Sequence, residues 1–184
     1  MRVAVLISGS GSNLEALLEA EREGFFESEI ALVVSSKPDA YGLVRAETYG
    51  KKTFVTGDGD LLDALEAEGI DFLVLAGYLK ILEADLLERY EGRILNIHPS
   101  LLPKYGGKGM YGMRVHEAVF ENNEKISGAT VHYVNEDIDG GRILLQTAVD
   151  ISRLQSPEEI QQTVLVLEHQ LLKIAVRWCE EERL

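Results

Sequence analysis

The chain has 184 residues, 46% of them hydrophobic and 27% charged, which is typical of one globular domain with a substantial core. Its net charge of −13 disfavours binding to nucleic acid, because such a field repels polyanions. No apolar run approaches the roughly 20 residues of a membrane-spanning helix, so we expect no membrane partner. The single cysteine, Cys179, excludes an intramolecular disulfide and indicates a reducing, cytoplasmic location.

Strands and helices alternate through the first half of the chain. Apolar runs typical of buried strands occur at residues 3–7, 30–36, 52–56, 71–77 and 93–98. Segments with apolar residues at helical spacing lie between them, at residues 13–24, 42–50, 60–69 and 83–92. Near-continuous apolar strands separated by helices predict a parallel sheet that is covered on both faces.

The pattern changes after Pro99. A glycine-rich loop is followed by a helix at 114–123, by strands at 127–134 and 142–151, and by a long helix at 156–182. The predicted fold is therefore α/β: an open, doubly wound, mostly parallel sheet with helices on both faces and an antiparallel extension. We expect a single domain over residues 1–184, with an N-terminal half at about 1–98 and a C-terminal half at about 99–184.

The turn "SGSGSNL" at residues 8–14 joins the first strand to the first helix. Glycines allow close approach of a ligand, and a helix start presents unpaired N–H groups, so the turn predicts a phosphate site on Gly11, Ser12 and Asn13. A dinucleotide fingerprint would need glycine where Leu14 stands. The alternative is an ordinary tight turn in which Ser12 or Asn13 caps the helix.

Asn96 and His98 end the strand at 93–98, just before Pro99. Residues two apart on a strand face the same side, and open α/β sheets place their sites at the carboxyl ends of strands. The plainer alternative for His98 is a buried histidine that satisfies a hydrogen bond in the core. The neighbouring asparagine and the strand end favour a functional pair.

An acidic loop, "NEDIDGG" at 135–141, offers a carboxylate partner for this pair. Position alone does not choose among its three acids, Glu136, Asp137 and Asp139. The other histidines show no zinc-ligand spacing, and there is no serine elbow, so metal and covalent mechanisms have little support. An asparagine, a histidine and an aspartate suit acyl transfer without a covalent intermediate, with the first two donating to a developing oxyanion.

Four segments together resemble the folate-dependent formyltransferase family, and within it the phosphoribosylglycinamide formyltransferases (glycinamide ribonucleotide transformylases) of purine synthesis: "ISGSGSNL", "VLAGYLKIL", "GRILNIHPSLLPKY" and "SGATVHYVNEDIDGGRILLQ". The resemblance covers essentially the whole chain. It implies a Rossmann-like enzyme that passes a formyl group from the cosubstrate 10-formyltetrahydrofolate to the amine of 5'-phosphoribosylglycinamide, with no metal.

The resemblance also implies roles for particular residues. His98 matches the family's catalytic histidine, Asn96 its oxyanion-binding asparagine, and Asp139 the aspartate that raises the histidine's pKa, so that a protonated His98 is expected. Glu168 matches a glutamate near the amine-bearing substrate, although helix position alone favours a solvated residue there. The folate would contact ten residues in two segments and the strand end: Leu79, Lys80, Ile81, Leu82, Asn96, Asn135, Glu136, Asp137, Ile138 and Asp139.

Three departures from the family pattern concern the folate side. No Lys or Arg occurs between Thr53 and Leu79, where the family often has an arginine for the folate's glutamate tail. Lys80 stands at a common arginine position, which keeps the charge and loses bidentate geometry. The loop around 105–113 is long, which leaves His116 without an assigned role. The apolar residues at 79, 81 and 82 are equally compatible with the core.

Other functions fit the sequence less well. A 10-formyltetrahydrofolate deformylase would share the catalytic set, but that family carries an additional N-terminal domain, and strand one here is expected to begin at residue 2. Methionyl-tRNA formyltransferases carry a C-terminal tRNA-binding domain. A noncatalytic phosphate-binding module, such as a receiver domain, would need acidic residues after strand one, where "SGSGSN" stands. The expected partners are small molecules, with a homodimer as a possibility.

Overall fold

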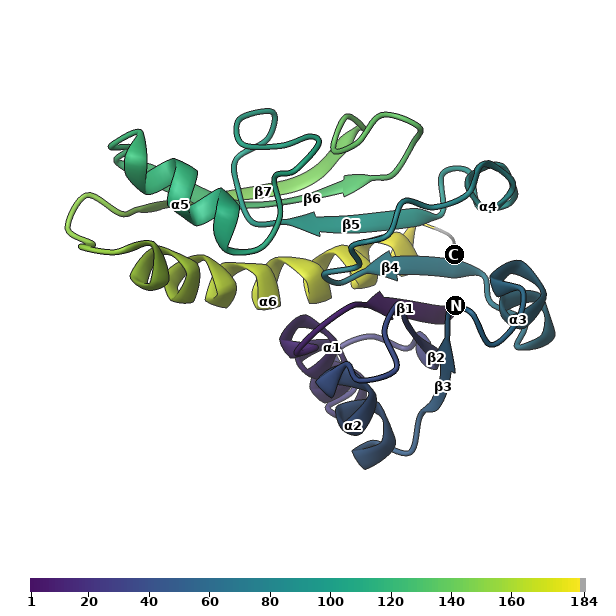
Figure 1. Ribbon diagram of the computed structural model, residues 1–184. Coiled ribbons are helices and arrows are strands. Elements are labelled where there is room, and N and C mark those ends of the chain that lie inside the picture. Colours follow the sequence, from purple (N-terminus) through teal and green to yellow (C-terminus); the bar gives the residue numbers. More distant parts are fainter. Residues whose placement is uncertain (183–184) are drawn as a thin grey trace.

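The computed structural model describes residues 1–182 as a seven-stranded sheet flanked by helices (Figure 1). The strand order is β3-β2-β1-β4-β5-β6-β7, and the first five strands in chain order run parallel. The last two strands pair antiparallel. The strands are β1 (Arg2–Ile7), β2 (Glu29–Ser35), β3 (Lys52–Val55), β4 (Phe72–Leu75), β5 (Ile94–His98), β6 (Ile126–Tyr133) and β7 (Ile143–Asp150). The predicted mostly parallel sheet with an antiparallel extension is confirmed.

Six helices lie among the described residues and cover both faces of the sheet. They are α1 (Ser12–Arg22), α2 (Tyr41–Thr48), α3 (Leu61–Ala67), α4 (Ala84–Arg89), α5 (Met113–Glu121) and α6 (Pro157–Glu181). Strand β1 shows why two layers are needed: Val5 packs into the core beneath α1 and α6, and the next residue, Leu6, packs into the core beneath α3 and α4. Successive strand residues face opposite sides, so an all-apolar strand requires helices on both faces.

Strand β5 lies at the boundary between the parallel and antiparallel parts of the sheet. It pairs with β4 on one edge and with β6 on the other, where Asn96 stands opposite His132. After β6 the chain turns sharply, with Asp139 in the left-handed region at φ 56°. The turn brings the acidic loop back over the end of β5. Polar groups from distant parts of the sequence therefore meet at one edge of the sheet.

Most boundaries differ from the sequence expectation by one to three residues, as at the end of β4 and the start of α1. Strand β4 ends at Leu75 and not at residue 77, because Gly77 adopts φ 80°, which an extended strand cannot continue. The first helix begins at Ser12, one residue before the predicted start. None of the helices in the described residues has the length and apolar character needed to cross a bilayer.

Candidate functional site

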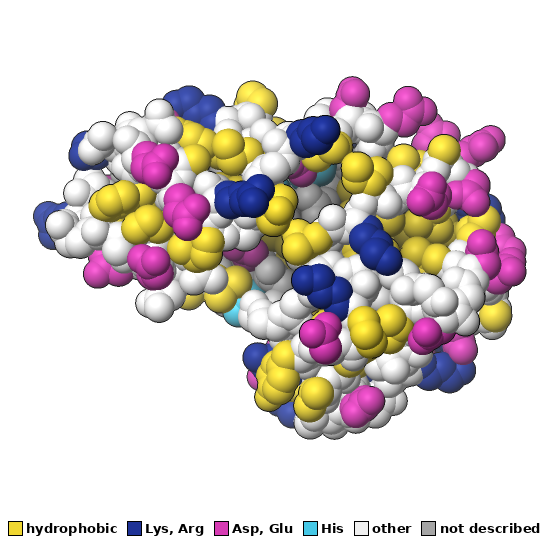
Figure 2. Space-filling model, in the orientation of Figure 1, with side chains coloured by type: hydrophobic (Ala, Val, Ile, Leu, Met, Phe, Trp, Pro, Cys, Tyr) yellow, Lys and Arg dark blue, Asp and Glu magenta, His cyan; other side chains and the backbone are white. Residues whose placement is uncertain are grey.

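A cleft of about 550 Å³ opens above the carboxyl ends of β4 and β5. Its walls come from the ends of both strands, from segments 77–82, 107–112 and 134–139, and from residues of α1, α5 and α6. Figure 2 shows the surface hollowed between two lobes, with Lys and Arg side chains around the opening. Lys80 and Lys108 are two of the lining residues. The lining also contains four acidic residues, Glu136, Asp137, Asp139 and Glu168, so the two ammonium groups offset only part of the negative charge of the cleft.

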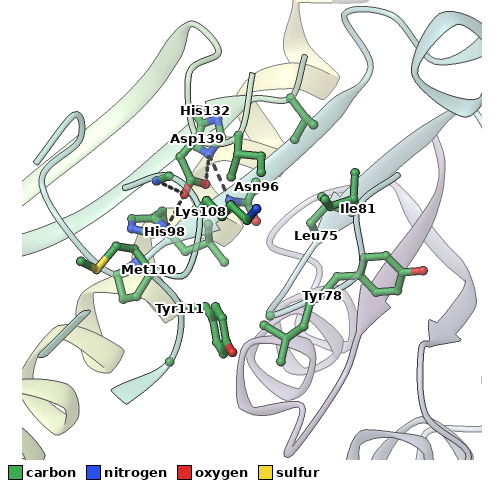
Figure 3. Close-up of a pocket in the computed structure, with 18 of the residues that line it drawn as sticks. Leu75, Tyr78, Ile81, Asn96, His98, Lys108, Met110, Tyr111, His132 and Asp139 are labelled. Carbon is green, nitrogen blue, oxygen red and sulfur yellow. Dashed lines mark hydrogen bonds and ion pairs between the residues drawn. The ribbon is translucent and has the colours of Figure 1, made fainter. Parts of the chain in front are cut away.

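His98 faces the polar wall of this cleft (Figure 3). The imidazole is 4% exposed, and its Nε2 lies 2.8 Å from the carbonyl oxygen of Tyr105. A carbonyl only accepts, so Nε2 carries a proton and donates it. The other nitrogen, Nδ1, lies 3.5 Å from Oδ2 of Asp139. His98 is therefore a buried histidine that satisfies a hydrogen bond and also faces a carboxylate, and its catalytic role stays a prediction.

The pKa of His98 reflects opposing influences. Burial lowers its pKa from the ordinary value, and it outweighs the Asp139 carboxylate, which acts in the opposite direction. The nearby His132 lowers the pKa of His98 further. The prediction that Asp139 favours the charged form is correct in direction, although burial has the larger effect on the pKa of His98. A protonated His98 in the reaction stays a prediction.

Asp139 is the acid that the fold selects from the acidic loop. Its Oδ2 accepts a hydrogen bond of 2.9 Å from the backbone N–H of Gly107, and its Oδ1 lies 3.6 Å from Nε2 of His132. Burial raises the pKa of Asp139, but the contacts with His132, His98 and Gly107 outweigh it, so the pKa is lowered overall. Glu136 and Asp137 are exposed. Asp139 is thus a carboxylate at neutral pH.

Asn96 is held by a residue to which the sequence gave no role. Its Nδ2 donates to Nε2 of His132 at 3.0 Å, while Nδ1 of His132 donates to the carbonyl of Tyr133 at 3.0 Å. These two contacts orient the amide of Asn96. The sequence offered only one indication of this contact, which was a lone histidine, His132, in an apolar strand. Within residues 1–182, no group of three or more His, Cys, Asp or Glu is placed to hold a metal ion.

His116 is a second lining residue without a predicted role. It is 2% exposed, its Nδ1 has no hydrogen-bond partner within residues 1–182, and it lies on α5 at the cleft. Burial and the nearby His98 lower the pKa of His116 to about 4. It is therefore neutral at physiological pH. The sequence did not predict that His116 lines the cleft, because the path of the long loop before α5 determines which residue of that helix reaches the cleft.

The predicted phosphate turn has the geometry of an open helix start. Gly11 is the N-cap of α1 at φ 72°, with no side-chain capping bond, so the alternative of a turn capped by Ser12 or Asn13 is not observed. Within residues 1–182, the backbone N–H groups of these three residues have no protein acceptor. The cleft reaches Asn13, whereas Gly11 and Ser12 lie beyond its lining.

Glu168 lies at the same end of the cleft and is 7% exposed. The expectation of a solvated residue is therefore wrong: the helix turns this carboxyl group inward, where Nδ2 of Asn13 donates to it at 2.8 Å. Burial raises the pKa of Glu168 to about 7, and the bond from Asn13 opposes that rise. The start of α1 and the long helix α6 are joined by this contact.

Replacing Glu168 with glutamine should remove a pH dependence of stability. In the wild type, the carboxyl group of Glu168 holds its proton to a higher pH in the folded state than in the unfolded state. The free energy of unfolding should therefore be highest below about pH 4.5 and should fall by about 3 kcal/mol as the pH rises through about 7. Glutamine keeps an acceptor for Asn13 and does not ionise. Denaturant unfolding at about pH 5 and about pH 8 measures the difference, with Glu158→Gln, an exposed residue of the same helix, as the control. Equal pH dependence in both variants would contradict the assignment.

The predicted folate segment at 79–82 is mostly outside the core. Leu79 and Ile81 are 52% and 77% exposed, whereas Leu82 is 8% exposed and packs in the core beneath α3 and α4. The backbone N–H of Leu79 donates to Oγ of Ser8 at 2.8 Å, and Nζ of Lys80 donates to Oγ1 of Thr56 at 2.8 Å. All four residues line the cleft, as do the predicted residues of the acidic loop, Asn135, Glu136, Asp137 and Ile138.

The fold and the cleft define a formyl transferase. The formyl transferase family model matches residues 1–176, so the chain belongs to this family. The predicted resemblance and the prediction of an enzyme of this family are thereby confirmed. The location of the catalytic and binding residues within the family pattern stays a prediction.

Particular relatives narrow the comparison. The chain is 41% identical to phosphoribosylglycinamide formyltransferase of Haemophilus influenzae, over 100% of this chain and 89% of that protein. It is 41% identical to the chloroplastic phosphoribosylglycinamide formyltransferase of Arabidopsis thaliana, over 98% of this chain, and spans 66% of that protein's length. The crystal structure of glycinamide ribonucleotide transformylase 1 from Symbiobacterium toebii matches with a TM-score of 0.91 at 36% identity, covering 100% of this chain and 89% of that one.

Proposed function

We propose that the chain transfers a formyl group from 10-formyltetrahydrofolate to the amine of 5'-phosphoribosylglycinamide. One observation carries this proposal: His98, Asp139 and Asn96 converge on one wall of a cleft that also reaches Asn13 at the start of α1 (Figure 3). The proposed acyl-transfer residues therefore line the same cavity as Asn13, the last residue of the proposed phosphate site. The names of the relatives support the same substrates.

In the proposed reaction, the amine attacks the formyl carbon and the carbonyl oxygen becomes negative. The amide of Asn96 has a second N–H beyond the one that binds His132, and this N–H would donate to the oxyanion. Protonation of His98 at Nδ1, beside Asp139, supplies another donor. One such donor is worth about 2.7–4 kcal/mol of transition-state stabilisation.

Two protons move in the proposed reaction, and Asp139 and His98 each transfer one of them. The amine must lose a proton as the new C–N bond forms, and the folate nitrogen must gain one as the old C–N bond breaks. Asp139, a carboxylate held 3.5 Å from His98, is the proposed acceptor of the amine proton. His98 is the proposed donor to the departing nitrogen. The proton gained by Asp139 then passes to Nδ1 of His98, 3.5 Å away, which restores the carboxylate and the imidazolium with which the cycle began.

The rival reaction is hydrolysis of the same folate by water. The open helix start beside the cleft favours the phosphorylated acceptor, because a deformylase needs no phosphate site. An absorbance assay of folate product with and without phosphoribosylglycinamide tests the choice. Product that forms only with the amine supports the transferase, and equal product without it would establish the deformylase.

Introducing a negative charge at the helix start should weaken phosphate binding selectively. Ser12→Asp adds a carboxylate at the first position of α1, where an acid is compatible with helix stability. Repulsion of the phosphate should raise KM for phosphoribosylglycinamide about tenfold or more, with KM for the folate unchanged. Initial-rate kinetics measure both constants. Ser12→Ala is the neutral control, and an unchanged KM in Ser12→Asp would remove the phosphate assignment.

The remaining parts of the proposal follow from the same site. The folate would lie along 79–82 and 135–139, which line the cleft, and the chemistry proposed here uses no metal. The partners are small molecules, and a sequence with a single cysteine, which cannot form an intramolecular disulfide, fits a reducing, cytoplasmic location. A homodimer stays a prediction.

A further inference from the structure

The carbonyl groups of the phosphate turn are fixed from one side. The carbonyl of Gly9 accepts from the N–H of Gly42 at 3.0 Å, and the carbonyl of Ser10 accepts from Nε of Arg45 at 2.9 Å. Both donors belong to α2, whose sequence the phosphate assignment does not use. In a trans peptide the C=O and N–H groups point in opposite directions. Fixing these two carbonyls against α2 therefore turns the N–H groups of Ser10 and Gly11 away from that helix.

The close approach of α2 depends on two glycines. A Cβ atom on Gly11 would lie 2.6 Å from the Cα of Gly42, and a Cβ on Gly42 would lie 2.3 Å from Cδ1 of Ile7. The first contact is with backbone and cannot be relieved unless the backbone moves, whereas the second would require the end of the Ile7 side chain to shift. The start of α2 can therefore approach the turn this closely only with glycine at position 11, and glycine at position 42 leaves room for Ile7. Arg45, one helical turn along α2, completes the contact with its side chain.

Arg45 also controls the charge beside the turn. Its Nη1 forms an ion pair with Glu15, the acid in the first turn of α1, and its side chain is 22% exposed. Its guanidinium lies 5.0 Å from the ring centroid of Tyr41, which limits the directions in which it can point. A planar guanidinium donates in two fixed directions at once, so one residue holds a carbonyl and neutralises a carboxylate.

We propose that Arg45 is a positioning residue for phosphate binding: it holds the Ser10 carbonyl against α2, so that the N–H groups of the turn stay directed at the phosphate. This inference rests on the proposed function, because it assumes a phosphorylated substrate at the start of α1. Arg45 acts through the turn and not through the reacting atoms. Its loss should therefore affect recognition of the phosphate and leave the chemical step in place.

The test compares Arg45→Met with Arg22→Met in the full chain. Arg22 also links α1 and α2, with its guanidinium 5.6 Å from the ring centroid of Tyr49, but it lies at the far end of α1. Arg45→Met should raise KM for phosphoribosylglycinamide about tenfold, with kcat and KM for the folate within about twofold of wild type. Arg45→Lys should give an intermediate value, and Arg22→Met should match wild type.

Two further measurements test whether Arg45 acts by positioning the turn. They distinguish this role from a loss of protein stability and from neutralisation of Glu15. The wild-type preference for the phosphorylated acceptor over its unphosphorylated riboside should shrink about tenfold in Arg45→Met, which loss of stability alone would not cause. In Arg45→Met the carboxylate of Glu15 loses its ion-pair partner, and the double variant Glu15→Gln with Arg45→Met removes that carboxylate. A KM that stays raised in the double variant supports positioning, and a return to the wild-type KM would overturn it in favour of simple charge neutralisation.

The outcomes distinguish this inference from the proposed function. If the wild type fails to transfer a formyl group to phosphoribosylglycinamide, the proposed function is wrong. If the wild type transfers it and Arg45→Met has the wild-type KM and phosphate preference, the role of Arg45 is wrong. Thermal unfolding of both methionine variants checks that each is folded at the assay temperature.

Discussion

Replacing His98 with alanine is expected to lower kcat/KM for formyl transfer by about a hundred- to a thousandfold. The imidazole lies beside Asp139 in the cleft, and its loss removes both an oxyanion donor and the proposed acid. Steady-state kinetics with both substrates measure the effect. KM for the phosphorylated acceptor should change little, because the proposed phosphate site is at the start of α1.

A matched histidine provides the control for this prediction. His169 lies on α6, outside the lining of the cleft, and His169→Ala should retain nearly full activity. Circular dichroism and thermal unfolding establish that His98→Ala is folded, since it removes a buried ring and its bond to the Tyr105 carbonyl. A folded His98→Ala enzyme with activity within threefold of wild type would refute the catalytic role.

Replacing Asp139 with asparagine should lower kcat/KM by about a hundredfold or more and change its pH dependence. Asparagine can still accept the hydrogen bond from Gly107, so the loop keeps its anchor. The negative charge is lost, however, and it is the main influence that raises the pKa of His98 against burial. The pKa of His98 should therefore fall further, and less imidazolium should be present at any given pH.

The pH profile makes this prediction specific. In the free enzyme, the protonated form of His98 decreases as the pH rises through a value already below the ordinary 6.5. The corresponding limb of the profile of kcat/KM should move to lower pH in Asp139→Asn. Asp58→Asn, at an exposed loop position, serves as the control. A profile unchanged in position, with only a lower plateau, would show that the carboxylate does not tune His98.

The sheet and helices could be predicted because they follow from local patterns. Alternation of apolar strands with amphipathic helices defines a parallel sheet, and the altered spacing after Pro99 correctly indicated the antiparallel strands. A functional site at the carboxyl end of β5 could be predicted because two polar residues end an apolar run. These inferences use neighbours in the sequence and require no knowledge of distant contacts.

The protonation of His98 and the burial of Glu168 could not be predicted in the same way. Both depend on what covers the side chain in three dimensions: a sequence shows that a carboxylate is available but not how much solvent is excluded around it. Burial outweighs the favourable charge at His98, and it keeps Glu168 from the solvent that its helix position suggested. The role of His132 was missed for a related reason, since it depends on the register between β5 and β6.

The proposed catalytic residues are not all held equally firmly, because two of them belong to β5, a strand that pairs with a neighbour on each edge. Asn96 has a strand partner on each edge and His98 pairs with Thr130 of β6, whereas Asp139 is carried by a surface turn and secured to the flanking loop through Gly107. Any adjustment as substrates enter should therefore come from the carboxylate approaching a stationary imidazole. Amide exchange should accordingly be slow along residues 94–98 and fast across 106–112 and 135–141.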